Sequence, residues 1–263
     1  MTETGRFVWY DLMTTDLPAA RDFYGHVVGW AIAEAGMPGT DYSLVRLGQM
    51  MVGGMMTLPD EVRAQGGRAG WMGYVAVADV DAASAAVSEA GGTIHRPPAD
   101  IPGIGRFCVA ADPQGAVFVL FRGDGPLPPA PTPGTPGHFG WHEMHATDWE
   151  EAFAFYAPLF GWVKTEAVDM GPLGIYQLFG APGPDGGCSG LHAGGMMTNA
   201  QVPAPFWLYY VNVEDIDAAG SRITAGGGRV VAGPHQVPGG AWTIHALDPQ
   251  GAMFGLVGPR PGA

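Results

Sequence analysis

The sequence predicts an α+β fold built from four related βαβββ units of about 60 residues each. Three repeated phrases support this prediction. TDLPAARDFYGHVVGW at 15–30 returns as TDWEEAFAFYAPLFGW at 147–162, and DPQGA at 112–116 returns at 248–252. YVAVADVDAA at 74–83 returns as YVNVEDIDAA at 210–219. A repeat of this period indicates stacked supersecondary units.

The first unit opens with an apolar, aromatic stretch that predicts a strand over 7–13. Thr15 or Asp16 can cap the helix that follows, and Gly29 ends it. Pro18 suits the first turn of this helix. Apolar residues then recur at helical spacing: Ala19, Ala20, Phe23, Tyr24 and Val27. Two further strands are predicted over 42–47 and 50–56.

The second unit repeats this order. We expect a strand over 74–78 and a helix from about 79 to 90, ended by a Gly-Gly pair. Strands over 107–110 and 117–122 follow, joined by the turn sequence DPQG at 112–115. The second half of the chain is predicted to follow the same pattern.

A stretch rich in proline and glycine, GDGPLPPAPTPGTPG at 123–137, predicts a semi-stiff linker between the halves. The sequence therefore predicts a first domain over 1–122 and a second domain over 138–263. The predicted units are 1–66, 71–122, 138–200 and 205–258.

The net charge of the chain limits the kinds of partner that it can bind. The net charge is −13, and Lys164 is the single lysine of the chain, so the sequence argues against nucleic acid or an anionic membrane. No signal peptide and no apolar run long enough to span a bilayer are recognisable. The two cysteines lie one in each half, which speaks against a disulfide framework. We expect a cytoplasmic protein, either a monomer or a homodimer.

Two spaced motifs carry a family resemblance. D-x-x-x-A-x-x-F-Y-x-x-x-x-G follows the first strand of each half, and D-P-x-G precedes the last strand. This arrangement resembles the vicinal oxygen chelate superfamily, which includes glyoxalase I, extradiol dioxygenases and the bleomycin- and fosfomycin-resistance proteins. The chain looks like the tandem glyoxalase/bleomycin-resistance/dioxygenase-like proteins of bacteria. The resemblance implies that units pair into cup-shaped domains, one cup per half.

The resemblance also implies where a metal would be held, and the chain departs from the family there. Metal-using members place His, Gln or Glu at fixed distances from the two motifs. The corresponding positions here are Trp9, Met72 and Val119 in the first half and Trp141, Leu208 and Gly255 in the second. None of these side chains is a ligand for a hard divalent cation. We therefore expect no family-type metal and no cofactor.

Polar residues on the same strand faces predict what the cups contain, because side chains two apart share a face. In the first cup we expect Asp11 opposite Tyr74, between Trp9 and Met72. In the second cup we expect a polar set beside Trp141, namely Glu143, His145, Tyr210 and Asn212, with His245 facing the same cup. A carboxylate facing a phenol in an apolar cup is a plausible acid/base pair.

Structural roles for the same residues stay open. Asp11 or Glu143 can instead bond strand or helix-end amides and hold two units together. His145, beside Glu143, can act as a general base or as a satisfied structural histidine.

Three functions are compatible with these residues. The first is metal-independent binding or sequestration of a small hydrophobic or aromatic molecule, as in the resistance proteins of the family. The second is a metal-independent lyase, isomerase or hydroxylase-type enzyme acting on a small carbonyl or phenolic compound. The third is a metal-dependent glyoxalase or dioxygenase, against which the missing ligands speak.

Overall fold

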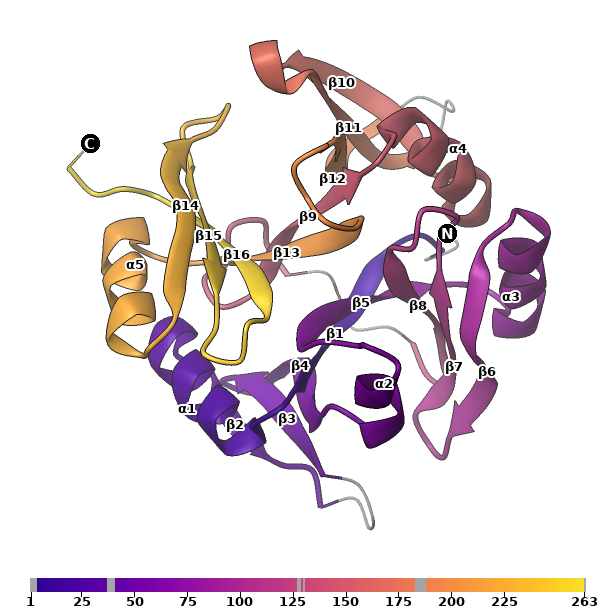
Figure 1. Ribbon diagram of the computed structural model, residues 1–263, viewed down its shortest axis with the longest axis horizontal. Coiled ribbons are helices and arrows are strands. Elements are labelled where there is room, and N and C mark those ends of the chain that lie inside the picture. The colour runs from indigo at the N-terminus through magenta and orange to yellow at the C-terminus, as the bar shows by residue number, and fades with distance from the viewer. Residues whose placement is uncertain (1–3, 37–40, 127–128, 130, 183–187, 263) are drawn as a thin grey trace. The chain divides into compact units, whose positions relative to one another are not determined.

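The computed structural model of the protein describes residues 4–36, 41–126, 129, 131–182 and 188–262, and of residues 182 and 188–192 the backbone only. Residues 127, 128 and 130 of the predicted linker lie outside the described residues, as do 1–3 and 263 at the ends of the predicted domains. The α+β class and the four βαβββ units are confirmed (Figure 1).

The first half holds two units and one additional short helix. Its strands are β1 (Phe7–Thr14), β2 (Ala31–Glu34), β3 (Tyr42–Leu47), β4 (Met50–Thr57), β5 (Gly70–Ala76), β6 (Thr93–Ile101), β7 (Gly105–Ala111) and β8 (Val117–Gly123). Its helices are α1 (Leu17–Val28), α2 (Asp60–Ala64) and α3 (Val80–Glu89). Helix α2 could not be predicted from the sequence, because it carries no buried side chain and therefore no apolar periodicity.

The second half repeats the order. Its strands are β9 (Phe139–Ala146), β10 (Val163–Asp169), β11 (Ile175–Pro182), β12 (Cys188–Thr198), β13 (Phe206–Asn212), β14 (Arg229–Gln236), β15 (Trp242–Leu247) and β16 (Met253–Gly258). Its helices are α4 (Trp149–Phe160), α5 (Ile216–Ala225) and the 3₁₀ turn η1 (Gly171–Leu173). No helix in the described part of the chain is long and apolar enough to cross a membrane.

Each half forms one eight-stranded sheet. The strand order is β2-β3-β4-β1-β5-β8-β7-β6 in the first half and β10-β11-β12-β9-β13-β16-β15-β14 in the second. In both sheets the first strand of the half runs parallel to the last strand of the same unit, β1 beside β4 and β9 beside β12. The two sheets therefore have the same topology, as the repeated phrases predicted.

The repeated aspartates start the four long helices. Asp16 accepts a hydrogen bond from the backbone N–H of Ala19 at 3.0 Å, and Asp79 accepts one from Ala82 at 3.0 Å. The other two long helices are capped in the same way by Asp148 and Asp215. These side chains satisfy N–H groups that have no partner within the helix, which is why the aspartate recurs in every unit.

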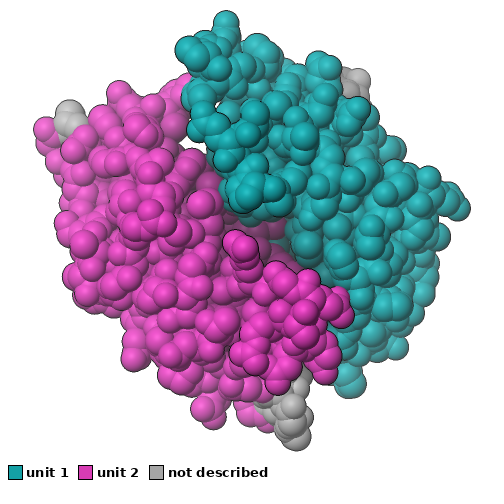
Figure 2. All heavy atoms as spheres, viewed as in Figure 1, with its two compact units in different colours: residues 1–8, 73–129, 142–207 teal, residues 9–72, 130–141, 208–263 magenta. Residues whose placement is uncertain are grey.

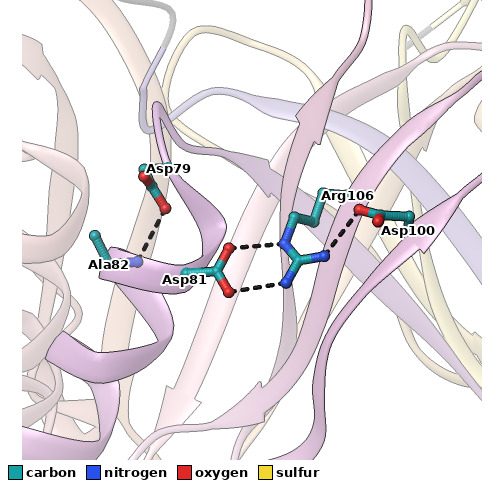
Figure 3. A network of polar contacts seen from close by, with 5 residues as sticks. All are labelled: Asp79, Asp81, Ala82, Asp100 and Arg106. Atoms are coloured by element: carbon teal, nitrogen blue, oxygen red, sulfur yellow. Dashed lines mark hydrogen bonds and ion pairs between the residues drawn. The ribbon is translucent and has the colours of Figure 1, made fainter.

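Helix α3 is also fixed to its sheet by ion pairs. Arg106 of β7 contacts Asp81 in the first turn of α3 at 2.7 Å and Asp100 of β6 at 2.8 Å (Figure 3). The pair with Asp81 uses both carboxylate oxygens, an arrangement that orients both side chains.

By internal contacts the chain divides into two compact units, shown in teal and magenta in Figure 2. Unit 1 comprises residues 1–8, 73–129 and 142–207, and unit 2 comprises residues 9–72, 130–141 and 208–263. Each compact unit thus contains one βαβββ unit from each half. The division of the chain at 123–137 into domains 1–122 and 138–263 stays a prediction.

Within each compact unit, the two sequence motifs meet. In unit 2 the hydroxyl of Tyr24 donates to Asp248 of the second DPQGA phrase at 3.2 Å, and Trp71 donates to the Tyr24 hydroxyl at 2.9 Å. Burial, reinforced by the charge of Asp248, raises the pKa of Tyr24 well above its ordinary value. The phenol therefore stays protonated and serves as a donor.

Unit 1 contains the matching chain of hydrogen bonds. Tyr156 donates to Asp112 of the first DPQGA phrase at 3.0 Å, and Trp207 donates to the Tyr156 hydroxyl at 3.0 Å. All three side chains are buried. The two motifs that reveal the repeat in the sequence therefore also bind one another in the fold.

Candidate functional site

The acid of the first half, Asp11 on β1, is 4% exposed and accepts hydrogen bonds from Trp9 and Tyr42. The indole N–H of Trp9 donates to Oδ1 at 2.9 Å, and the hydroxyl of Tyr42 donates to the same oxygen at 2.7 Å. Trp9 lies two residues before Asp11 and shares its strand face. Tyr42 comes from β3, so two strands contribute to this acid site.

Glycine makes room for the tyrosine. Gly54 on β4 is the register partner of Asp11, and a Cβ at Gly54 would collide with the Tyr42 hydroxyl. Burial, together with the nearby charge of Asp11, raises the pKa of Tyr42 far above its ordinary value. The hydroxyl therefore stays protonated and donates a hydrogen bond to the carboxylate.

The second half repeats this arrangement around Glu143 on β9, which is 9% exposed. The hydroxyl of Tyr176 on β11 donates to Oε2 of Glu143 at 2.8 Å. Gly195 on β12 is the register partner of Glu143, and a Cβ there would collide with the Tyr176 ring. An acid, a tyrosine and a glycine thus occupy matching places in both halves.

His145 adds a second titratable group to the acid site of the second half. Its Nε2 lies 2.8 Å from Oε1 of Glu143, and the two side chains are 6% and 11% exposed. Its Nδ1 lies 3.0 Å from the side-chain nitrogen of Asn199, which follows β12. The ring of Phe206 stacks on the imidazole, with centroids 4.8 Å apart. The sequence-predicted pair of Glu143 and His145 is therefore in direct contact.

Three other predicted residues have different partners. The hydroxyl of Tyr210 on β13 lies 2.5 Å from Nε2 of His245 on β15. The buried amide of Asn212 donates to the backbone carbonyl of His138 at 3.0 Å, which gives it a structural bond.

Tyr74 is buried, and its ring packs edge-on against Phe121. The predicted pairs Asp11–Tyr74 and Glu143–Tyr210 join residues of different compact units and stay predictions.

Sequence reasoning missed four side chains of these sites: Tyr42, Tyr176, Asn199 and Phe206. A signal for the tyrosines was present, because each precedes a Gly-Gly pair in the same unit, at 53–54 and at 194–195. A glycine facing a neighbouring strand marks a place where another group approaches closely. Asn199 carries no comparable signal, since it follows its strand in a loop-like sequence.

The residues present do not fit a family-type metal. Trp9, Met72 and Val119 in the first half offer no ligand atom for a hard cation. The same holds for Trp141, Leu208 and Gly255 in the second. Across the described ranges, no group of three or more His, Cys, Asp or Glu side chains lies in a position to hold a metal ion.

His142, the neighbour of Glu143, has a structural place. Its ring stacks on Phe7 with centroids 4.0 Å apart, and its Nδ1 lies 2.6 Å from the carbonyl oxygen of Ala193. Because a carbonyl only accepts hydrogen bonds, Nδ1 carries the proton. Burial lowers the pKa of His142 to about 4, so the ring is neutral at pH 7.

Comparison with known proteins places this geometry in context. The model of the Glyoxalase/Bleomycin resistance protein/Dioxygenase superfamily matches residues 6–120 and 135–256. The anthracycline biosynthesis protein DnrV of Streptomyces peucetius is 30% identical over 98% of this chain and 94% of its own. DauV of Streptomyces sp. strain C5, also called an anthracycline biosynthesis protein, is 29% identical over 96% of this chain and 93% of its own.

A solved structure shows the same fold. The 2,3-dioxygenase LapB from Pseudomonas sp. KL28 superimposes with a TM-score of 0.64, covering 100% of this chain and 96% of its own. The sequences are 15% identical, so this likeness concerns the fold alone.

Proposed function

We propose that this chain, which belongs to the glyoxalase/bleomycin resistance protein/dioxygenase superfamily, binds a flat, hydroxylated aromatic molecule without a metal ion. One observation carries the proposal. The positions at which metal-using relatives hold their cation are occupied here by non-ligating side chains, while a buried acid stands two residues along the strand in each half. Chemistry through a chelated metal is thereby disfavoured, and recognition by hydrogen bonding is favoured.

The chemistry of the acid sites supports an aromatic ligand with hydroxyl groups. Trp9 and Tyr42 place aromatic surface beside Asp11, and Phe206 does so beside His145. Flat rings stack on such surfaces, and a carboxylate accepts a hydrogen bond from a phenol. The two Streptomyces relatives are named for anthracycline biosynthesis, and anthracyclines are flat, hydroxylated polycyclic compounds.

A second candidate function is proton transfer on the same class of ligand, and the Glu143–His145 contact favours it. A carboxylate and an imidazole 2.8 Å apart can exchange a proton with a phenolic or carbonyl substrate. In this reading the second half is catalytic and the first half binds.

Two measurements test the proposal. Elemental analysis of the purified full chain should find zinc, nickel, iron and manganese far below one equivalent, and a chelator should leave the melting temperature unchanged. Titration with 1,4-dihydroxyanthraquinone, a flat dihydroxylated probe, should give saturable binding in the chelated protein. A stoichiometric metal whose removal lowers the melting temperature would instead support a metal-dependent glyoxalase or dioxygenase, because a metal bound to the native state stabilises it.

A further inference from the structure

The orientation of the Asn199 amide is fixed by its second hydrogen bond. The side-chain oxygen of Asn199 accepts the backbone N–H of Gln201 at 3.1 Å. The NH₂ group therefore points to the other side, where it lies 3.0 Å from Nδ1 of His145. An NH₂ group can only donate, so Nδ1 of His145 accepts and carries no proton.

The opposite nitrogen of the same ring faces a carboxylate. Nε2 of His145 lies 2.8 Å from Oε1 of Glu143. A bare nitrogen lone pair at this distance would repel the oxygen lone pairs, whereas a protonated nitrogen is attracted to them. Together the two contacts select the neutral imidazole that carries its proton on Nε2.

The first half shows that Asn199 accompanies the histidine. The backbone N–H of Asn199 donates to Ala146 at 2.9 Å, and the backbone N–H of Leu58 donates to Thr14 at 2.7 Å. Leu58 therefore occupies the place of Asn199 in the first half. There the residue two positions after the acid is Met13, where the second half has His145. Two apolar residues in one half are replaced together by two polar residues in the other.

We infer that Asn199 is a positioning residue, which holds His145 in the tautomer protonated on Nε2, the nitrogen that lies beside the carboxyl group of Glu143. The cluster then presents carboxylate oxygens, which accept hydrogen bonds and repel other carboxylates. Such a cluster favours a neutral ligand that donates a hydroxyl proton and disfavours a carboxylate ligand. This statement about the ligand rests on the proposed function, whereas the tautomer does not depend on it.

The test is the tautomer of His145, read by two-bond ¹H–¹⁵N correlation on the full chain labelled with ¹⁵N-histidine at pH 7. The signals of His145 are assigned by their loss in His145→Met. In the unchanged protein we expect the pattern of a ring protonated on Nε2. In Asn199→Asp, the carboxylate at this place can only accept, so we expect both ring nitrogens to be protonated.

His142 provides the internal control in every spectrum. Its Nδ1 contacts the Ala193 carbonyl, so it should show the opposite tautomer, protonated on Nδ1, in the unchanged protein and in Asn199→Asp. A preserved His142 pattern shows that the variant is folded around the site. The inference is overturned if His145 carries its proton on Nδ1 in the unchanged protein, or if Asn199→Asp leaves its pattern unchanged.

Ligand binding separates this inference from the proposed function. The probe 1,4-dihydroxyanthraquinone should bind at least about tenfold more tightly than anthraquinone-2-carboxylate, since a hydrogen bond to a charged group contributes more than a factor of ten. Equal affinities, or no binding of either probe, would count against the proposed function, while the tautomer pattern would still decide the role of Asn199.

Discussion

The sites around Asp11 in the first half and Glu143 in the second, here called the acid sites, share a common arrangement of residues. They differ in the side chains that surround this common part. In both, a buried acid on the first strand accepts a tyrosine hydroxyl, and a glycine on the parallel strand leaves room for the tyrosine. In the first half the indole N–H of Trp9 also donates to Asp11. The second half has a longer acid, Glu143, and adds His145.

This difference distinguishes the residues that both sites need for structure from those that can serve a chemical function. The shared part uses neutral donors that close around an acid, and such an arrangement satisfies buried polar groups wherever it occurs. The added part of the second half brings in an imidazole, a side chain suited to proton transfer, together with an asparagine that contacts it. We therefore expect the second half to carry the function that depends on proton position.

The strongest test of this comparison replaces each acid by its amide. Glu143→Gln should weaken binding of 1,4-dihydroxyanthraquinone by about tenfold or more, because a charged acceptor is lost. If the site turns over a phenolic substrate, we expect a rate loss of about 10²–10⁴-fold. Binding is measured by isothermal titration and turnover by absorbance.

Asp11→Asn is the matched control, since it makes the same change in the other half. It should affect binding less than Glu143→Gln and lower the melting temperature by a comparable amount. Equal losses of affinity in the two variants would remove the distinction between the halves.

The two hydrogen-bonded Trp–Tyr–Asp sets of the compact units should lose similar stability on mutation, in contrast to the acid sites. Tyr24→Phe removes the donor to Asp248, and Tyr156→Phe removes the donor to Asp112. Each variant leaves a buried carboxylate without one of its partners, so we expect each to cost about 1–3 kcal/mol of unfolding free energy. Urea denaturation followed by circular dichroism measures both. A loss in one variant only would show that the two compact units are not equivalent.

A double-mutant cycle tests whether His145 and Asn199 form one unit. His145→Met and Asn199→Leu introduce the residues of the first half. Each single change leaves a polar partner facing an apolar group, while the double change removes both polar groups. We expect the double variant to lose less unfolding free energy than the two singles together, with a coupling of about 1 kcal/mol. Additive losses would mean that the contact contributes nothing of its own.

Much of the fold follows from the sequence, because the repeat is carried by residues with clear local roles. Asp16 caps a helix through a backbone N–H, and Gly29 ends that helix with a left-handed φ of 85°. Such roles depend on neighbours in sequence, so they can be predicted. The contact of Glu143 with His145 was predictable for the same reason, since residues two apart on a strand share a face.

The partners that come from other strands could not be predicted in this way. Tyr42 and Tyr176 reach the acids across one intervening strand, β4 or β12, and the register that places them is set by pairing within the sheet. The contacts between Tyr24 and Asp248, far apart in the chain, also depend on the packing of helices from different halves. Sequence spacing gives no information about such distances.

The smallest effect we predict is a pH dependence of the stability of the fold. It comes from Asp112 and Asp248, the aspartates that begin the two DPQGA phrases. Burial raises the pKa of Asp112 and of Asp248 above the ordinary value of 3.8, more than their amide and tyrosine hydrogen bonds lower it. Between 3.8 and the raised pKa, the folded state binds more protons than the unfolded state, so stability falls as pH rises through this window.

Asp112→Asn and Asp248→Asn remove the titrating groups, one in each compact unit. The stability of the unchanged protein relative to either variant should therefore be greatest below pH 3.8 and decrease as the pH rises, to the same degree for both. Melting temperatures collected across this range give the comparison. A relative stability that increases with pH would mean that the hydrogen bonds from Tyr156 and Tyr24 outweigh burial, and that these aspartates favour the folded state as anions.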